Sequence, residues 1–148
     1  MVTGIPGKSG VVYTLDRATG EFLWATPTVA QNVITSIDGA TGAVSENQEL
    51  VFRREGQEVF VCPTLMGGKD WEAGAYSPMS NVMFFPLRNI CARQMADSTA
   101  GGLGGALYSL VTRLEVAPNT DQVGTVQAIS VETGETLWTY EQRAHLRW

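Results

Sequence analysis

The stretch 67–78, which reads GGKDWEAGAYSP, gathers side chains that could bind a ligand in a segment too polar and too rich in glycine for an ordinary strand. It is also longer than a hairpin turn needs. An ionised Asp70 can only accept hydrogen bonds, and Trp71 offers an apolar wall. On spacing alone it reads as a glycine-rich loop between two strands. Held on a rigid scaffold, such a loop would be a place where binding residues collect.

Two cysteines, Cys62 and Cys91, are the other residues with distinctive chemistry. They could be inert buried thiols, a reactive pair or one disulfide, and their spacing alone does not choose among these. The chain has no CxxC motif and a single histidine, which argues against a zinc site.

The composition argues against several classes of function. Charged residues make up 17% of the chain, and the formal net charge is −5. Binding phosphates needs clustered Lys and Arg, and the longest basic cluster here is the pair Arg53-Arg54, so no nucleic-acid partner is expected. No apolar run approaches the roughly 20 residues that span a bilayer. The N-terminal MVTGIPGKSG lacks the apolar segment of a signal peptide.

Both ends of the chain suggest a piece of a larger protein. Strand-like sequence begins by Val11 with little before it, and the chain stops at Trp148, a poor residue to leave on a free end. Residues 1–148 are therefore expected to form one partial domain, truncated at both ends.

Short β-strands are the elements expected to position these residues. Residues 11–15 are rich in β-branched and aromatic side chains, residues 16–20 form a turn with Gly20 placed for a positive φ, and residues 21–24 resume a strand. No helix with sustained 3.6-residue periodicity is expected. Residues 89–95 could make about one helical turn, and residues 101–105 read as a flexible glycine-rich loop.

This hairpin recurs along the chain. VVYTLDRATGEFLW (11–24) matches TVQAISVETGETLW (125–138) at a shift of 114 residues, and a reduced copy, VITSIDGATGAV (33–44), keeps the Asp and the Thr-Gly turn but has Glu46 where Trp would fall. The repeat favours a partial β-propeller of about three blades over a β-sandwich whose hairpins share turn chemistry. Trp24 and Trp138 are then expected to lie flat against neighbouring sheets, and Asp16 and Asp38 to bind backbone N–H groups in their turns.

The sequence also resembles a known family, the quinoprotein methanol and ethanol dehydrogenases that use pyrroloquinoline quinone (PQQ). The D-x-x-T-G-x-x-x-W hairpin resembles their tryptophan-docking motif. The stretches GKSGVVYTLDRATGEFLW (7–24), CPTLMGGKDWEAGAYSP (62–78) and AISVETGETLWTYEQRA (128–144) occur in the family's order, so the resemblance covers nearly the whole chain.

The resemblance implies a fragment from the middle-to-C-terminal part of an eight-bladed propeller and a periplasmic parent enzyme. That parent would oxidise primary alcohols with PQQ beside a calcium or lanthanide ion and pass electrons to a periplasmic cytochrome c. In the family the metal ligands and the aspartate base precede the position of Lys8, so no catalytic or metal-binding residue is matched here. The fragment alone is expected to be inactive, and homo-oligomer formation is left open.

Three cofactor-binding residues follow from the resemblance. Lys8 matches a Lys or Arg that hydrogen-bonds the quinone oxygens, where a cation stabilises charge that develops on reduction. Asp70 and Trp71 match an Asn-Trp pair that contacts PQQ, with the glycines before them letting the backbone approach a flat cofactor. Since Asp can only accept hydrogen bonds, Asp70 is expected to face a ring N–H or to pair with Lys8 or Lys69.

The resemblance further implies that Cys62 and Cys91 form a disulfide and that the compartment is oxidising. Trp148 is a weaker match to a tryptophan of the cofactor pocket. The alternative is a non-enzymatic propeller scaffold for protein–protein interaction, which needs the hairpin repeats but not Lys8, the GGKDW stretch or the cysteine pair.

Overall fold

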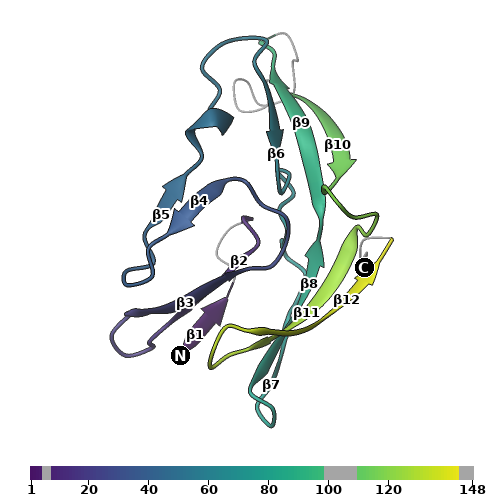
Figure 1. Ribbon diagram of the computed structural model, residues 1–148. Helices are drawn as coiled ribbons and strands as arrows, with labels where there is room; N and C mark the ends of the chain where they lie inside the picture. The colour runs from purple at the N-terminus through teal and green to yellow at the C-terminus, as the bar shows by residue number, and fades with distance from the viewer. Residues whose placement is uncertain (5–7, 99–109, 144–148) are drawn as a thin grey trace.

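The chain is all-β in the computed structural model, which describes residues 1–4, 8–98 and 110–143 (Figure 1). The sequence prediction of an all-β fold is therefore confirmed. The glycine-rich loop expected at 101–105 and Trp148 lie outside the described residues. The described elements, in chain order, are β1 (Val2–Gly4), β2 (Val11–Leu15), β3 (Phe22–Pro27), β4 (Ile34–Ile37), β5 (Val44–Glu46), the short 3-10 helix η1 (Gln48–Leu50), β6 (Glu58–Val61), β7 (Ala75–Ser77), β8 (Val82–Arg88), β9 (Ile90–Ala96), β10 (Leu110–Val116), β11 (Gly124–Ser130) and β12 (Thr136–Gln142).

The described strands pair antiparallel in four sheets. The N-terminal sheet has the order β1-β2-β3, and the C-terminal sheet has the order β12-β11-β8-β7. The third sheet has the order β10-β9-β6; Cys91 lies in β9, and Cys62 directly follows β6. The fourth sheet is the hairpin β4-β5. Strands β8 and β9 follow one another through Asn89, so the third sheet extends from the C-terminal sheet along one long path (Figure 1).

The helical turn expected at residues 89–95 is wrong, because Ile90–Ala96 forms β9. This strand pairs with β10 on one side and β6 on the other, so both neighbours hold its backbone N–H and C=O groups. Local sequence gives no such information, since both partners come from distant parts of the chain.

The repeated hairpins have the same local geometry. Register shifts fall between Thr14 and Leu15 in β2 and at the matching place, between Ala128 and Ile129, in β11. Within the first turn, Asp16 Oδ1 accepts the N–H groups of Ala18 (2.8 Å) and Thr19 (2.9 Å).

Asp38 does the same in the reduced copy, accepting the N–H groups of Ala40 (3.1 Å) and Thr41 (2.8 Å). The Thr41 hydroxyl also donates to Asp38. These hydrogen bonds lower the pKa of both carboxyls; the largest cause is the Thr19 N–H at Asp16 and the Thr41 hydroxyl at Asp38. The predicted turn role of the two carboxylates is confirmed.

One of two hydrophobic clusters among the described residues lies between the N-terminal and C-terminal sheets, and the other surrounds the Cys62–Cys91 disulfide. Trp24 on β3 packs against the first of these clusters, and its indole Nε1 donates a hydrogen bond to the carbonyl oxygen of Val131 (3.2 Å). The ring lies over Gly134, in the turn between β11 and β12, so Trp24 packs against a neighbouring sheet as the repeat predicts. The buried members of this first cluster are Val12, Phe85, Leu87 and Ile129.

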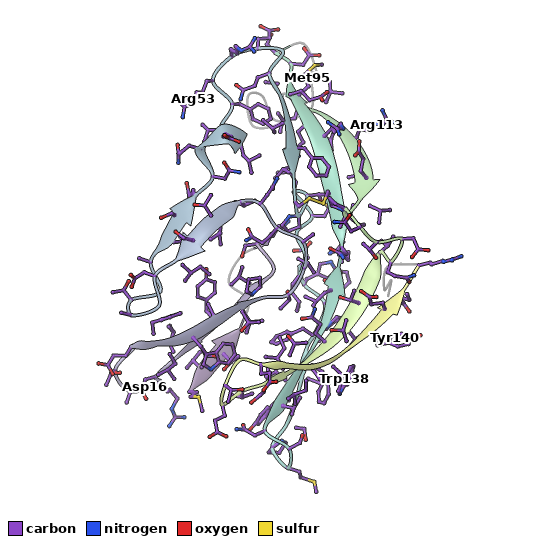
Figure 2. All side chains as sticks on the ribbon, in the orientation of Figure 1. Asp16, Arg53, Met95, Arg113, Trp138 and Tyr140 are labelled. Carbon is purple, nitrogen blue, oxygen red and sulfur yellow. A yellow bond between two sulfur atoms is a disulfide. The ribbon has the colours of Figure 1, made fainter. Side chains whose placement is uncertain are left out.

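The same prediction is wrong for Trp138 among the described residues, although the two tryptophans match in the repeat. It lies on the edge strand β12, 5.8 Å between ring centroids from Phe84 of its own sheet, and is 49% exposed. Figure 2 shows Trp138 and Tyr140 at the outer edge of the C-terminal sheet. Among the described residues, no helix has the length and apolar character needed to cross a membrane.

Candidate functional site

The segment between β6 and β7 lies against the loop that carries Lys8. The N–H of Gly68 donates to the carbonyl oxygen of Lys8 (3.1 Å), and the N–H of Arg88 donates to the carbonyl oxygen of Gly68 (2.7 Å). The predicted binding loop is thus held between the Lys8 loop and the end of β8.

The two glycines of this loop have a packing role that the sequence did not suggest. Gly67 has a φ of +76°, and a Cβ there would collide with the Lys8 side chain. A Cβ on Gly68 would lie 2.5 Å from Cγ2 of Val29. Their small size therefore lets the loop backbone approach Lys8 and Val29.

A cluster of opposite charges occupies the loop. Asp70 Oδ1 lies 3.8 Å from Lys8 Nζ, and Asp70 Oδ2 lies 3.8 Å from Nη2 of Arg88. The Asp70 side chain is 25% exposed, and both distances exceed hydrogen-bond range. The predicted pairing of Asp70 with Lys8 is present, whereas Lys69 Nζ donates to the carbonyl oxygens of Asp70 and Glu72.

Glu72 connects the parts of this cluster. Its Oε1 lies 2.8 Å from Arg88 Nη2, and its Oε2 accepts the backbone N–H of Asp70 (3.2 Å). Burial raises the pKa of the Glu72 carboxyl. A hydrogen bond from its own N–H, the Arg88 charge and further donors outweigh burial, so the pKa is held below its usual value.

Trp71 is the exposed apolar member of the site. Its side chain is 75% exposed, although tryptophan is among the most costly side chains to leave in water. It stands between Asp70 and Glu72 in sequence, so it projects from the same short loop as the charge cluster. A solvent-facing indole beside balanced charges suits a flat ligand with polar edges.

Lys8 also lines a cavity of about 270 Å³. Its walls are mostly apolar, and they include the buried Gln94, whose side-chain nitrogen has no hydrogen-bond partner among the described residues. Lys8 therefore belongs both to this cavity and to the charge cluster.

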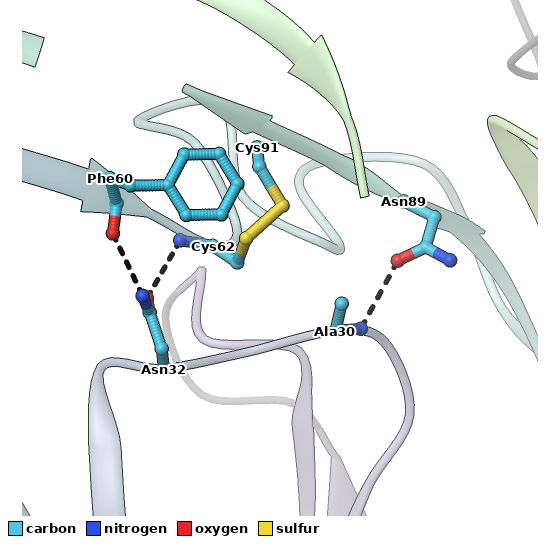
Figure 3. Close-up of a disulfide and its surroundings, with 6 residues drawn as sticks. All are labelled: Ala30, Asn32, Phe60, Cys62, Asn89 and Cys91. Carbon is cyan, nitrogen blue, oxygen red and sulfur yellow. Dashed lines mark hydrogen bonds between the residues drawn. A yellow bond between two sulfur atoms is a disulfide. The ribbon is translucent and has the colours of Figure 1, made fainter. Parts of the chain in front are cut away.

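The disulfide between Cys62 and Cys91 lies directly before the binding loop (Figure 3). It joins the end of β6 to β9, and the two side chains are buried. Asn32 braces the same place by donating to the carbonyl oxygen of Phe60 (2.8 Å) and accepting the N–H of Cys62 (2.8 Å). The disulfide prediction is confirmed, and the loop starts from a fixed point.

The structure brings Lys8 and Asp70 together, with Trp71 next to them, and adds two residues that sequence reasoning missed. Glu72 and Arg88 complete the cluster. Arg88 ends the otherwise apolar run VMFFPLR, and a charge at the end of a buried strand is a signal that could have marked it. Its partner could not be found from sequence, since the pair forms only when β8 meets the loop.

The residues present fit an anionic, planar ligand such as PQQ. The Lys8 ammonium is half exposed and can reach a ligand, whereas the side-chain Nε and Nη2 of Arg88 are buried, with Nη2 close to Glu72. An accessible cation near an exposed indole suits carboxylate and carbonyl oxygens. Among the described residues, no group of three or more His, Cys, Asp and Glu side chains could hold a metal ion.

Comparison with known proteins gives consistent relatives. No protein-family model matches the chain. The chain is 27% identical to the quinoprotein ethanol dehydrogenase of Pseudomonas putida, over 94% of this chain and 23% of that protein. It is 26% identical to the methanol dehydrogenase [cytochrome c] subunit 1 of Methylorubrum extorquens, over 93% of this chain and 23% of that protein.

Among solved structures, the europium-containing methanol dehydrogenase has a TM-score of 0.74 and 24% identity, over 92% of this chain and 24% of that chain. This likeness confirms the predicted partial β-propeller. The chain spans less than a quarter of the length of the curated relatives it matches. The homologues of this chain are thus quinoprotein methanol and ethanol dehydrogenases, and the chain corresponds to a segment of their propeller.

Proposed function

We propose that this chain is part of a periplasmic PQQ-dependent alcohol dehydrogenase and supplies one side of its cofactor pocket. The observation that carries the proposal is the approach of Lys8 and Asp70 to 3.8 Å, because these residues come from separate loops and both match cofactor-binding positions. The dehydrogenase relatives support the class of reaction.

Each matched residue has a role that its surroundings permit. The Lys8 ammonium, half exposed, can donate to quinone oxygens and stabilise negative charge there. The Asp70 carboxylate has no hydrogen bond to either neighbouring cation, so it can accept one from a ring N–H. Trp71 supplies an apolar face, 75% exposed, for a flat ring system.

The rest of the reaction is assigned to the whole protein. When PQQ and a calcium or lanthanide ion are bound there, they supply the hydride acceptor and the Lewis acid for oxidising a primary alcohol. A cytochrome c is the proposed electron acceptor, since the name of the Methylorubrum relative includes cytochrome c. The metal ligands and the catalytic base are proposed to lie outside this chain, so the chain alone is expected to reduce no dye when given alcohol.

Titration of the chain with PQQ, followed by tryptophan fluorescence, tests the proposal. Quenching is expected for the wild type, and Trp71→Phe should remove part of it, because Trp71 is the exposed indole of the loop. Lys8→Met should weaken binding about tenfold, the loss of one charge-assisted hydrogen bond. Arg17→Met, which removes an exposed cation from the turn at residues 16–20, is the control and should bind as the wild type does.

Equal affinity in the wild type and Lys8→Met would contradict the assignment of Lys8. Absence of quenching in every protein would favour the scaffold alternative. Alcohol-dependent dye reduction by the isolated chain would contradict the division of the site between this segment and the rest of the protein.

A further inference from the structure

We infer that Arg88 is a positioning residue of this site, which acts with Glu72 to hold the 68–72 loop so that Asp70 stays beside Lys8. The cofactor in this inference rests on the proposed function, whereas the pairing of the side chains does not. Neither Arg88 nor Glu72 was among the residues that the sequence suggested.

Arg88 contacts the loop at two places and lies near it at a third. Its backbone N–H donates to the carbonyl oxygen of Gly68 (2.7 Å), and its Nη2 lies 2.8 Å from Glu72 and 3.8 Å from Asp70. Glu72 in turn accepts the backbone N–H of Asp70 (3.2 Å). Glu72 therefore holds the Asp70 backbone, and Arg88 compensates the negative charge of the Asp70 side chain.

The arrangement is costly for stability alone. The Arg88 side chain is 13% exposed, and its Nε and Nη2 have no aligned acceptor among the described residues. Replacing both partners of such a buried ion pair by apolar side chains of similar volume is often neutral or stabilising, whereas removing one partner alone is destabilising. A positioning role explains why a cation stands at the end of a buried strand.

The charge balance explains how Asp70 can serve an anionic ligand. PQQ carries carboxylates, which an uncompensated Asp70 would repel. Lys8 and Arg88 flank the Asp70 carboxylate at equal distances of 3.8 Å without forming hydrogen bonds to it. The carboxylate charge is thus compensated while its oxygens stay able to accept a hydrogen bond.

A set of variants at Arg88 and Asp70 tests the inference by PQQ affinity. Arg88→Met should weaken binding about tenfold by leaving Asp70 less compensated, and Arg88→Lys should recover part of the loss because it keeps the charge but not the fork geometry. In the Asp70→Asn background, Arg88→Met should change affinity by less than about twofold. Arg93→Met is the matched control, since Arg93 pairs with Glu58 and Glu115 on the neighbouring strands and is 49% exposed.

If Arg88→Met weakened PQQ binding equally with Asp70 and with Asn at position 70, the inference would be overturned, because Arg88 would then act without Asp70. Far-UV circular dichroism of each variant shows whether the fold is kept. If Arg88→Met does not fold, Arg88→Lys in the two backgrounds makes the same comparison.

Thermal unfolding without cofactor separates this inference from the proposed function. Arg88→Met and Glu72→Gln each leave one buried charge without its partner, so each should lower Tm by several degrees. The double variant should lose less than the sum of the two single losses. Additive losses would overturn the inference even if PQQ binds, and non-additive losses would support it even if PQQ does not.

Discussion

The indole ring of Trp24 lies over Gly134, so that a Cβ on that glycine would be 2.6 Å from Cε3 of the ring. The pair joins the N-terminal sheet to the C-terminal sheet, and Thr26 adds a hydrogen bond to the carbonyl oxygen of Gly134 (2.7 Å). The matching glycine of the other repeat, Gly20, has nothing within 4 Å of its Cβ position. The two hairpin turns have the same backbone conformation, but of these two only the turn at Gly134 is covered by an aromatic ring.

Gly134→Ala is therefore expected to destabilise the chain more than Gly20→Ala. Both residues have a positive φ, 76° and 78°, so the backbone strain of alanine is the same. The extra loss at Gly134 is the displacement of Trp24, about 1–3 kcal/mol by analogy with overpacked cores. Urea unfolding of the two variants measures the difference, and equal losses would show that the ring contact contributes little.

Reduction of the Cys62–Cys91 disulfide should lower stability by about 3–4 kcal/mol, because the bond closes a loop of 29 residues in the unfolded chain. Urea unfolding with and without dithiothreitol measures this loss. In the Cys62→Ala/Cys91→Ala variant the reductant should have no effect, and any effect there would show that reduction acts elsewhere.

Asn32→Ala should cost about 2–3 kcal/mol, since it leaves the N–H of Cys62 and the carbonyl oxygen of Phe60 without their partner. Thr35→Ala is the control, because Thr35 makes one exposed hydrogen bond to the carbonyl oxygen of Ser45 (3.0 Å) and should cost less than about 1 kcal/mol. If urea unfolding gave the two variants similar losses of unfolding free energy, Asn32 would not be holding the segment before β4.

Glu72 makes stability depend on acid pH in a defined direction. Its pKa is lowered in the folded chain relative to the unfolded value of about 4.3. The stabilisation is therefore present above that value and is lost as pH falls through the folded pKa. The stability gap between wild type and Glu72→Gln should be largest near pH 7 and shrink towards pH 3.

Urea unfolding at pH 7, 4.5 and 3 measures this gap. Glu58→Gln removes a carboxylate from an exposed pair with Arg93 and should cost less than about 1 kcal/mol at pH 7. A constant gap for Glu72→Gln across the three pH values would contradict the assigned direction of its pKa.

Local signals located the glycine-rich loop of the candidate site in the GGKDW stretch. The pairing of Cys62 with Cys91 followed from the resemblance to the dehydrogenases and not from spacing, and the structure confirms it. The turn role of Asp16 also followed from sequence, because its partners are two and three residues away. Segment 89–95 was misassigned because a strand held by two distant neighbours has no distinct local pattern.

By itself the sequence determined the elements whose interactions are local: the alternation of strands and turns, the repeated hairpin and the chemistry of the loop. Only the tertiary structure decided which partners these elements meet. Arg88 pairs with Glu72, and Trp24 covers Gly134 while Trp138 remains half exposed, although the two tryptophans match in sequence. The physical reason is that packing and charge compensation depend on distances between segments far apart in the chain, and a local residue pattern does not reveal those distances.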